Sequence, residues 1–267
     1  MRSKRNGSQR LTALVTGGSG GIGLEIAKVL ARKGFDLVLV SRNRDTLEAA
    51  SSQLEGSHGI KAHVFAADLR YAEAPESIFD FLHNENIPIA ILVNNAGFGL
   101  GGEFSETDLE RELDMIQVNI GALTHLTKLF LPEMIKRKSG RVLNVASTAA
   151  FLPGPLMAVY YATKAYVLSF SEALAEELRD SGVTVTALCP GPTRTDFAEA
   201  AKVTRSRIFN AFGIADAADV AEYGVSAMMH GRRVAIPGIK NKILAQANRF
   251  APRAITARVG RMTRETP

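Results

Sequence analysis

Six short apolar runs recur along the chain, and the segments between them have the spacing of amphipathic helices. The runs that read as strands cover residues 11–17, 36–41, 62–68, 89–97, 141–147 and 183–191. Between them, apolar residues three and four apart predict helices over residues 22–33, 44–54, 106–137 and 157–180. Continuous apolar strands that alternate with helices are typical of a parallel sheet buried on both faces. The chain is therefore expected to be a doubly wound α/β protein.

The alternation runs without an interrupting linker from residue 11 to residue 238. A short run at 233–238 predicts a last strand at one edge, which gives a sheet of about seven strands with helices on both faces. We therefore expect one domain over 11–238, a basic N-terminal tail over 1–10 and a basic C-terminal helical extension over 239–267. Pro252 is expected to divide that extension into two helices.

Composition limits the compartment and the chemistry. With 46% hydrophobic and 22% charged residues the chain has the make-up of a soluble globular protein, and no stretch approaches the roughly 20 apolar residues that span a bilayer. The lone cysteine, Cys189, excludes an internal disulfide and any cysteine-pair metal or redox motif. The five histidines have no ligand spacing with acids or cysteine, so no metal site is expected. A cytoplasmic protein fits these features.

The net charge of +5 comes from the two ends of the chain. Residues 1–10 hold four basic residues and no acid, residues 231–267 hold nine against Glu265 alone, and the segment between them is net acidic. Nucleic-acid binding needs a basic face on a reader module, and no such module is recognisable, so no nucleic-acid partner is expected. A basic C-terminal segment is more often a solvated surface; the alternative is a weak contact with a membrane surface or a partner.

The first predicted strand ends in the glycine-rich stretch TGGSGGIG, residues 16–23, directly before a predicted helix. Glycines at such a turn let the backbone approach a pyrophosphate, and the free N–H groups at the helix start receive its negative charge. Strand, turn and helix in this order predict a Rossmann fold that binds a dinucleotide. The cofactor-binding residues expected here are Gly17, Ser19, Gly21, Ile22 and Gly23. Two alternatives stay open: a turn that only reverses the chain, and a hydrolase elbow of the form G-x-S-x-G around Ser19.

The end of the second predicted strand indicates which dinucleotide binds. NAD sites usually place an acid there for the ribose hydroxyls, whereas NADP sites place a base for the 2′-phosphate. The strand opens with Asp36, at the edge away from the ligand, and closes with Ser41 and Arg42, which favours NADP(H). Asp68 and Leu69 follow the third strand on the ligand side, where Asp68 is expected to accept a hydrogen bond from the adenine amino group. A solvated surface position for Arg42 and a helix-capping role for Asp68 are the alternatives.

The stretch VYYATKAY, residues 159–166, places Lys164 four residues after Tyr160 and three after Tyr161. Residues three or four apart share a helix face, so the lysine is in reach of either tyrosine and the spacing does not choose between them. A nearby ammonium lowers the phenol pKa from its free value of about 10, which makes a tyrosine a workable acid or base near neutral pH. Ser147, at the end of the fifth strand, faces the same crevice and can hydrogen-bond a carbonyl oxygen.

Taken together, these motifs resemble the short-chain dehydrogenase/reductase family over residues 10–240. The matching features are TGGSGGIG, NNAG at 94–97, Asn119 in VNIGA, Ser147, Tyr160 with Lys164, and PGPTRT at 190–195. Residues 148–159 give the separation between serine and tyrosine that the family shows, so the resemblance selects Tyr160 and makes Tyr161 its packing neighbour. The stretches NNAGFGLGGEF and KNKILAQANRFAPRAI resemble the branch related to hydroxysteroid and 3-oxoacyl-CoA reductases.

The resemblance implies a role for each matched residue. Tyr160 would be the general acid and base, Lys164 would lower its pKa and bind the nicotinamide ribose, Ser147 would orient the substrate carbonyl, and Asn119 would hold a water in a proton relay. The motifs NNAG and PGPTRT would contact the cofactor through Asn95, Ala96, Gly97, Pro190, Gly191, Thr193 and Thr195, with Thr195 on the carboxamide. The family also implies a homodimer or homotetramer that pairs through the helices within 106–137 and 157–180.

The segments expected around the substrate are largely apolar. They are residues 151–157 and the stretch after the sixth strand, with Phe197, Ile208, Phe209 and Phe212. Such walls suit a lipophilic carbonyl compound; Arg205 and Arg207 are either exposed charges or ligands for a carboxylate or an acyl-carrier phosphate. We therefore expect an NADP(H)-dependent oxidoreductase that transfers hydride between nicotinamide and a ketone or aldehyde, or a secondary alcohol. The alternative is a catalytically idle dinucleotide-binding protein that acts through its basic tail.

Overall fold

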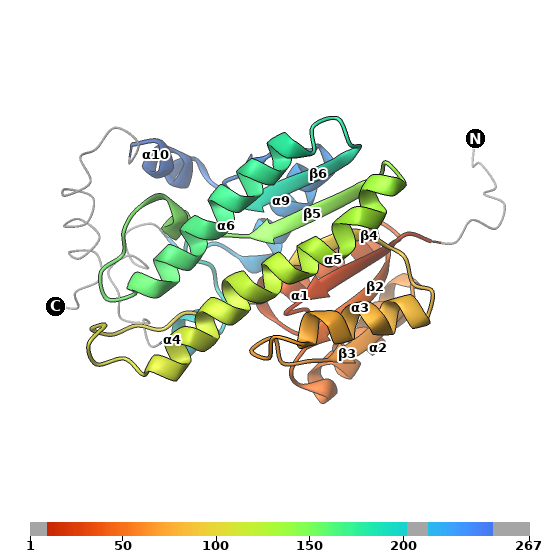
Figure 1. Ribbon diagram of the computed structural model, residues 1–267, viewed down its shortest axis with the longest axis horizontal. Coiled ribbons are helices and arrows are strands. Elements are labelled where there is room, and N and C mark those ends of the chain that lie inside the picture. The colour runs from red at the N-terminus through yellow and green to blue at the C-terminus, as the bar shows by residue number, and fades with distance from the viewer. Residues whose placement is uncertain (1–9, 202–212, 248–267) are drawn as a thin grey trace.

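The computed structural model describes residues 10–201 and 213–247, and within these ranges seven parallel strands form one sheet. The strands are β1 (Thr12–Thr16), β2 (Asp36–Ser41), β3 (Ala62–Ala66), β4 (Ile89–Asn94), β5 (Gly140–Val145), β6 (Val183–Leu188) and β7 (Val234–Ala235). Their order is β3-β2-β1-β4-β5-β6-β7, so the direction of travel across the sheet reverses between β1 and β4 (Figure 1). This order confirms the predicted doubly wound fold, and β7 occupies the expected edge.

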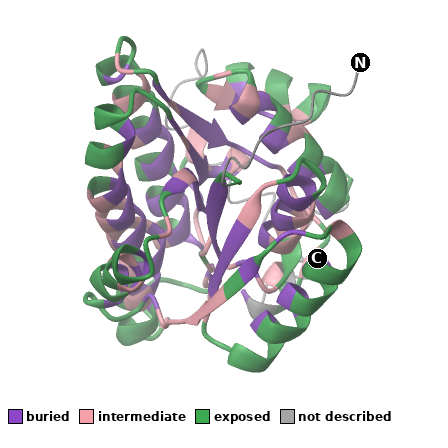
Figure 2. Cartoon of the chain, turned by 90° about the vertical axis from the view of Figure 1, so that its right-hand side faces the viewer, coloured by how far each residue is buried: buried purple, intermediate pink, exposed green. Residues whose placement is uncertain are grey.

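Helices cover both faces of the sheet. One layer consists of α1 (Gly21–Arg32), α2 (Arg44–His58) and α9 (Ala217–Met229), and the other of α3 (Ala74–Asn84), α5 (Leu123–Lys136) and α6 (Ala158–Glu177). Side chains of a strand alternate between the layers: Ala13 and Val15 pack with the first, and Leu14 packs with the second. Figure 2 shows the buried strands between helices whose outer sides are exposed. Because both faces are covered, the strands are mostly apolar, which is why they could be recognised in the sequence.

The helix predicted over 106–137 is interrupted near its start. It consists of α4 (Leu109–Ile116), a π-helical turn η1 (Gln117–Ala122) and α5. The side chain of Gln117 lies over Gly121, where any side chain would overlap it. Asn119 lies within the π turn, and such turns in otherwise regular helices often occur at functional sites.

A buried polar network joins the second helical layer to the sheet. The Asn94 amide donates to Thr127 Oγ1 at 3.0 Å and to Asn144 Oδ1 at 2.9 Å, and the Asn144 amide donates to Ser171 Oγ at 2.9 Å. These bonds connect β4 and β5 to α5 and α6 in the protein interior. Because a buried polar group is costly when unpaired, the network fixes the position of α6, which carries the predicted tyrosine and lysine.

The C-terminal extension begins with α10 (Ile239–Ala247). The second helix expected beyond Pro252 lies outside the described residues, as do most of the N-terminal tail and the predicted substrate residues Arg205, Arg207, Ile208, Phe209 and Phe212. Within residues 10–201 and 213–247, no helix has both the length and the apolar character needed to cross a membrane.

Candidate active site

A cleft runs across the carboxyl ends of the strands, where the strand order reverses. It consists of two adjoining cavities, and the larger has a volume of about 480 Å³, within the range usual for ligand sites. Gly17, Ser19, Arg42, Ala96 and Gly97 line both cavities. Every predicted cofactor residue except Gly23 lines at least one of them, and so do the predicted catalytic residues Ser147, Tyr160 and Lys164.

The glycine-rich turn opens the start of α1 to the cleft. Gly17 and Gly21 have φ angles of 64° and 52°, in the left-handed region that favours glycine. Gly20 precedes the helix without a side-chain cap, and the first turn of α1 contains no acid. The N–H groups at this helix start therefore face the cavity without a competing carboxylate, as an anion site requires.

Gly23 lies behind the turn instead of lining the cleft. A side chain there would overlap the carbonyl oxygen of Gly17 and the amide of Asn95. Asn95 Nδ2 in turn donates to Thr16 O at 2.9 Å, and Thr16 Oγ1 accepts from the backbone N–H groups of Asn95 and Ala96, both at 3.0 Å. Gly23 and Asn95 thus hold the turn against β4, which is a packing contribution to the cofactor site.

Ser41, Arg42, Asp68 and Leu69 meet at the far end of the cleft, as predicted from their positions after β2 and β3. Among the described residues Ser41 Oγ is shielded from solvent and has no hydrogen-bond partner, and no acid forms an ion pair with the exposed Arg42. A shielded hydroxyl beside an unpaired guanidinium fits a phosphate group.

Asp68 is held by an arginine that the sequence analysis did not single out. The Arg70 guanidinium contacts the Asp68 carboxylate at 2.6 Å and reaches Asp114 on α4 at 3.3 Å. The hydrogen bonds from Arg70 lower the pKa of Asp68 below its usual value, although partial burial opposes them. Asp68 is therefore an oriented, ionised acceptor at this end of the cleft.

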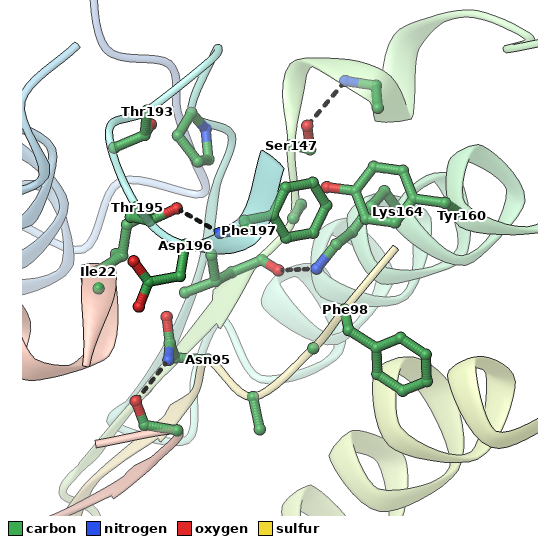
Figure 3. Close-up of a pocket in the computed structure, with 18 of the residues that line it drawn as sticks. Ile22, Asn95, Phe98, Ser147, Tyr160, Lys164, Thr193, Thr195, Asp196 and Phe197 are labelled. Atoms are coloured by element: carbon green, nitrogen blue, oxygen red, sulfur yellow. Dashed lines mark hydrogen bonds between the residues drawn. The ribbon is translucent and has the colours of Figure 1, made fainter. Parts of the chain in front are cut away.

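Tyr160 and Lys164 lie one turn apart on α6, and the phenol hydroxyl and the ammonium both point into the cavity (Figure 3). Lys164 Nζ is 5.8 Å from the centre of the Tyr160 ring and donates to Val145 O at 2.8 Å. Only 6% of Lys164 is exposed. Burial lowers the pKa of Lys164 to about 8. The amine is still mostly protonated at pH 7, so it can stabilise a phenolate at Tyr160.

Ser147 occupies the position before the short helix η2 (Thr148–Phe151), opposite Tyr160. Its Oγ accepts from the N–H of Ala149 at 3.1 Å. Because this bond uses a lone pair and not the proton, the hydroxyl can still donate to an oxygen in the cavity.

Asn119 does not line the cavity and is 1% exposed. Its Oδ1 accepts from the N–H of Phe98 at 3.1 Å, and its Nδ2 donates to Phe98 O and to Thr163 Oγ1, both at 3.0 Å. The side chain therefore fastens the loop after β4 to α6. Gly97 in that loop has no side chain, which lets Asn119 and Lys164 approach the backbone closely.

The wall beside Tyr160 is apolar. The rings of Tyr160 and Phe197, in α7 (Phe197–Ala200), have centres 5.2 Å apart, and Met157 packs in the same cluster. A methyl group on Gly99 would lie 2.8 Å from Phe197 and 2.9 Å from Met157, so this glycine lets the wall close. Tyr161, predicted as a packing neighbour, does pack edge-to-face on Tyr160 and also lines the cavity.

The loop 190–195, which the family resemblance places beside the nicotinamide, lines the larger cavity together with Tyr160. Thr193 Oγ1 donates to Gly191 O at 2.9 Å, and Thr195 Oγ1 accepts from the N–H of Phe197 at 3.3 Å. Phe98 and Asp196 also line the cavity, and the sequence analysis missed them. Phe98 directly follows NNAG and Asp196 directly follows PGPTRT, and this proximity was the only feature of the sequence that could have indicated them.

Comparison with known proteins shows which family the chain belongs to. The model of the short chain dehydrogenase family matches residues 11–206. The very-long-chain 3-oxoacyl-CoA reductase of Homo sapiens is 37% identical over 200 residues, which are 72% of this chain and 62% of the relative. The chain thus spans less than two thirds of that relative's length.

Two solved structures share the whole architecture. A short-chain dehydrogenase from Sphingobium yanoikuyae in complex with NADPH has a TM-score of 0.81 and 30% identity, covering 90% of this chain and 94% of that chain. The bulky-bulky ketone specific alcohol dehydrogenase from Comamonas testosteroni has a TM-score of 0.77 and 28% identity, covering 91% and 93%. The chain belongs to the short-chain dehydrogenase family, as its motifs predicted.

The cleft fits the nicotinamide dinucleotide that this family uses. The uncapped start of α1 suits the pyrophosphate, the unpartnered Ser41 Oγ suits a ribose or phosphate oxygen, and Asp68 suits an amino group. The opposite end holds the ionisable pair Tyr160 and Lys164. A dinucleotide laid along the cleft would therefore join both ends.

Proposed function

We propose that the protein is an NADP(H)-dependent oxidoreductase that reduces a lipophilic ketone or aldehyde, or oxidises the corresponding secondary alcohol. The observation that carries this proposal is the convergence of Tyr160, Lys164 and Ser147 at one end of the dinucleotide cleft. Arg42 and Ser41 at the other end support NADP(H) over NAD(H). The NADPH in the Sphingobium relative supports the same preference.

When bound, the reduced dinucleotide supplies the hydride that reaches the carbonyl carbon. Tyr160 gives its phenolic proton to the carbonyl oxygen, and the ammonium of Lys164 stabilises the phenolate that remains. Ser147 donates a hydrogen bond to the same oxygen and orients it. The Asn119 amide is already bonded to Phe98 and Thr163, so its side chain would have to give up one of these bonds to hold a relay water.

An apolar carbonyl compound is the substrate class that we infer. Met157, Tyr161 and Phe197 line the cavity around Tyr160 and would exclude water from the reacting oxygen. The names of two similar proteins, a very-long-chain 3-oxoacyl-CoA reductase and a bulky-bulky ketone specific alcohol dehydrogenase, support a substrate with large apolar groups beside the carbonyl.

The test measures NADPH oxidation with a panel of alkyl and aryl ketones and 3-oxoacyl thioesters. Tyr160→Phe should lower kcat by about 10²- to 10⁴-fold, because the proton donor is lost while the ring remains. Tyr166→Phe is the matched control on the same helix, and it should retain wild-type rates. Equal rates in wild type and Tyr160→Phe would refute the catalytic assignment. Binding of NADPH without turnover of any carbonyl would favour an idle dinucleotide-binding protein.

We also infer a homodimer or homotetramer in the cytoplasm. The exposed side chains of Leu109, Leu113 and Ile116 lie on one face of α4 and support pairing through this helix. Light scattering of wild type and Leu113→Asp tests the assembly; a monomeric wild type would contradict it.

The single free cysteine, Cys189, is buried and compatible with a reducing compartment, which cell fractionation would check.

A further inference from the structure

The helix α10 has one face on the protein and one face in solvent. Ala245 is buried with Cys189, Ala146 and Ile236, and the Asn241 amide donates to Pro237 O at 2.8 Å. On the opposite side, Ile239 is 75% exposed and Ile243 is 64% exposed. Ile239 has the largest exposed fraction of the large apolar side chains in the described part of the chain. A docked helix would ordinarily turn such side chains inward.

The outward side chains follow the pattern of a helix that lies on a membrane surface. At about 100° per residue, Ile239 and Ile243 fall at the centre of the exposed side, and Lys240 and Lys242 flank them on opposite edges. Within residues 10–201 and 213–247 neither lysine forms an ion pair; Lys242 Nζ lies 5.6 Å over the Tyr223 ring. An apolar centre between lysines suits the boundary of lipid tails and headgroups. We call Ile239, Lys240, Lys242 and Ile243 the outer face of α10.

Charge complementarity selects an anionic lipid surface as the occupant. Residues 231–267 contain nine basic residues and one acid, whereas the chain between residues 11 and 230 is net acidic. An anionic surface attracts the first segment and repels the rest, which orients the molecule with α10 toward the lipid. A second copy of the chain has the same net acidic segment between residues 11 and 230. Its charge would not orient the two isoleucines in this way.

The inner side of α10, opposite its outer face, packs beside the candidate active site. The Asn241 amide packs so closely on Gly191 that a methyl group there would lie 2.7 Å from Nδ2, and Gly191 belongs to the loop 190–195. α10 also contacts η2, which follows Ser147 directly. Figure 1 shows α10 at the same end of the molecule as the connection between β5 and α6. A surface bound to α10 would therefore lie next to the cleft.

We propose that the outer face of α10 binds an anionic lipid bilayer, so that the cleft takes its carbonyl substrate beside the membrane in which that substrate dissolves. The docking itself is independent of catalysis, and the consequence for substrate supply rests on the proposed function. The lysines attract the headgroups, and the isoleucines insert below them. Because Asn241 links the inner side of α10 to Gly191, the bound helix remains in contact with the loop 190–195.

The docking test is co-sedimentation of the full chain with vesicles of phosphatidylcholine alone or with phosphatidylserine added. Wild type should bind the anionic vesicles at least about tenfold more tightly, and added salt should weaken the binding. The double variant Ile239→Ser, Ile243→Ser should lose about tenfold or more of this affinity, because it removes the inserted side chains. Lys240→Gln with Lys242→Gln should lose the preference for anionic vesicles in part.

The control is Leu11→Ser, which removes a side chain that is 62% exposed just before β1, an inner strand, at the amino ends of the strands. It should bind vesicles like wild type. No binding by wild type, or equal binding by the double isoleucine variant, would overturn the docking proposal. A change of oligomeric state in the isoleucine variant, with vesicle binding intact, would also overturn it and assign the face to a second copy.

Activity separates this proposal from the proposed function. With a water-soluble ketone and no vesicles, the isoleucine variant should turn over at the wild-type rate; with a ketone dissolved in anionic vesicles, it should be several-fold slower. Equal rates with the vesicle-borne ketone would overturn the link between docking and substrate supply. Vesicle binding by a wild type that reduces no carbonyl compound would remove the proposed function and leave the docking surface standing.

Discussion

The two ends of the cleft are built differently. At the catalytic end, Lys164 is almost fully buried, its ammonium is bonded to Val145, and α6 is anchored by the network of Asn94, Asn144 and Ser171. At the far end, where we propose that the adenosine binds and which we call the adenosine end, Arg42 is exposed, and Arg70 holds Asp68 in an ion pair that faces solvent. The side chains proposed for catalysis are thus fixed in place by packing. The side chains proposed to select the cofactor are instead exposed, and water screens their charges.

This difference has energetic consequences. A buried charge whose partners are removed lowers the stability of the fold and has a strongly shifted pKa. An exposed ion pair contributes little to stability. Substitutions at the catalytic end should therefore change the rate and the stability strongly. Substitutions at the adenosine end should change affinities modestly and leave the fold intact.

After Tyr160→Phe, the largest effect is expected from Lys164→Met. The substitution keeps much of the buried volume but removes the charge that stabilises the Tyr160 phenolate, so kcat should fall by about 10²- to 10³-fold. Steady-state kinetics with a reducible ketone measure this, with Lys61→Met as a control that removes an exposed lysine at the far edge of the sheet. A variant within a few-fold of the wild-type rate would show that the charge beside Tyr160 is not needed.

The same lysine should make stability depend on pH. Its pKa of about 8 in the folded protein is below the value of 10.5 expected when it is exposed. Between these values the unfolded chain holds a proton that the folded chain has released, so stability rises with pH in this window. The unfolding free energy of wild type minus that of Lys164→Met should increase by about 3 kcal/mol from pH 8 to pH 10.5. Urea titrations at several pH values measure it, and a flat or falling difference would contradict the buried charge.

Gly23→Ala tests the packing behind the glycine-rich turn. The added methyl group must displace the Gly17 carbonyl or the Asn95 amide, at a cost of about 1–3 kcal/mol in stability, and NADPH binding should weaken as the turn moves. Urea titration and fluorescence titration with NADPH measure the two effects. Gly56→Ala is the matched control, because its methyl group would meet no atom within 4 Å. Equal stability of both variants would indicate that the glycine-rich turn moves to admit the methyl group without a loss in the free energy of unfolding.

The sequence predicted the fold well, because strands buried on both faces are mostly apolar and stand out between amphipathic helices. Ser147 and Lys164 line one cavity, where a strand end and a helical spacing had predicted them, and their catalytic roles stay predictions. The sequence could not predict the π turn around Asn119, which depends on Gln117 folding over Gly121. Nor could it predict that Arg70 also reaches Asp114, because that contact joins residues 44 positions apart in the chain.

Arg42→Asp should change cofactor preference more than it changes the fold. Hydrogen bonds to a charged group contribute about 1.5–3 kcal/mol, so the NADPH affinity should fall by at least about tenfold while NADH binding changes little. Titration with both dinucleotides measures the ratio. Arg44→Asp is the neighbouring control, since Arg44 pairs with Glu48 on α2 and should leave the preference unchanged. An unaltered ratio in Arg42→Asp would mean that another group binds the 2′-phosphate.

The smallest effect is expected from Arg70→Gln, and it separates the two functions of the adenosine end. Arg70 orients the Asp68 carboxylate but pairs with it at the surface, where such contacts contribute about 0–1 kcal/mol. The affinities for NADPH and NADH should therefore fall by the same factor, about two- to threefold, because adenine is common to both cofactors. Asp114→Asn keeps the pair with Asp68 and should have less effect still. A loss confined to NADPH would show that Arg70 binds the 2′-phosphate beside Arg42, and that the carboxylate of Asp68 needs no help to stay in place.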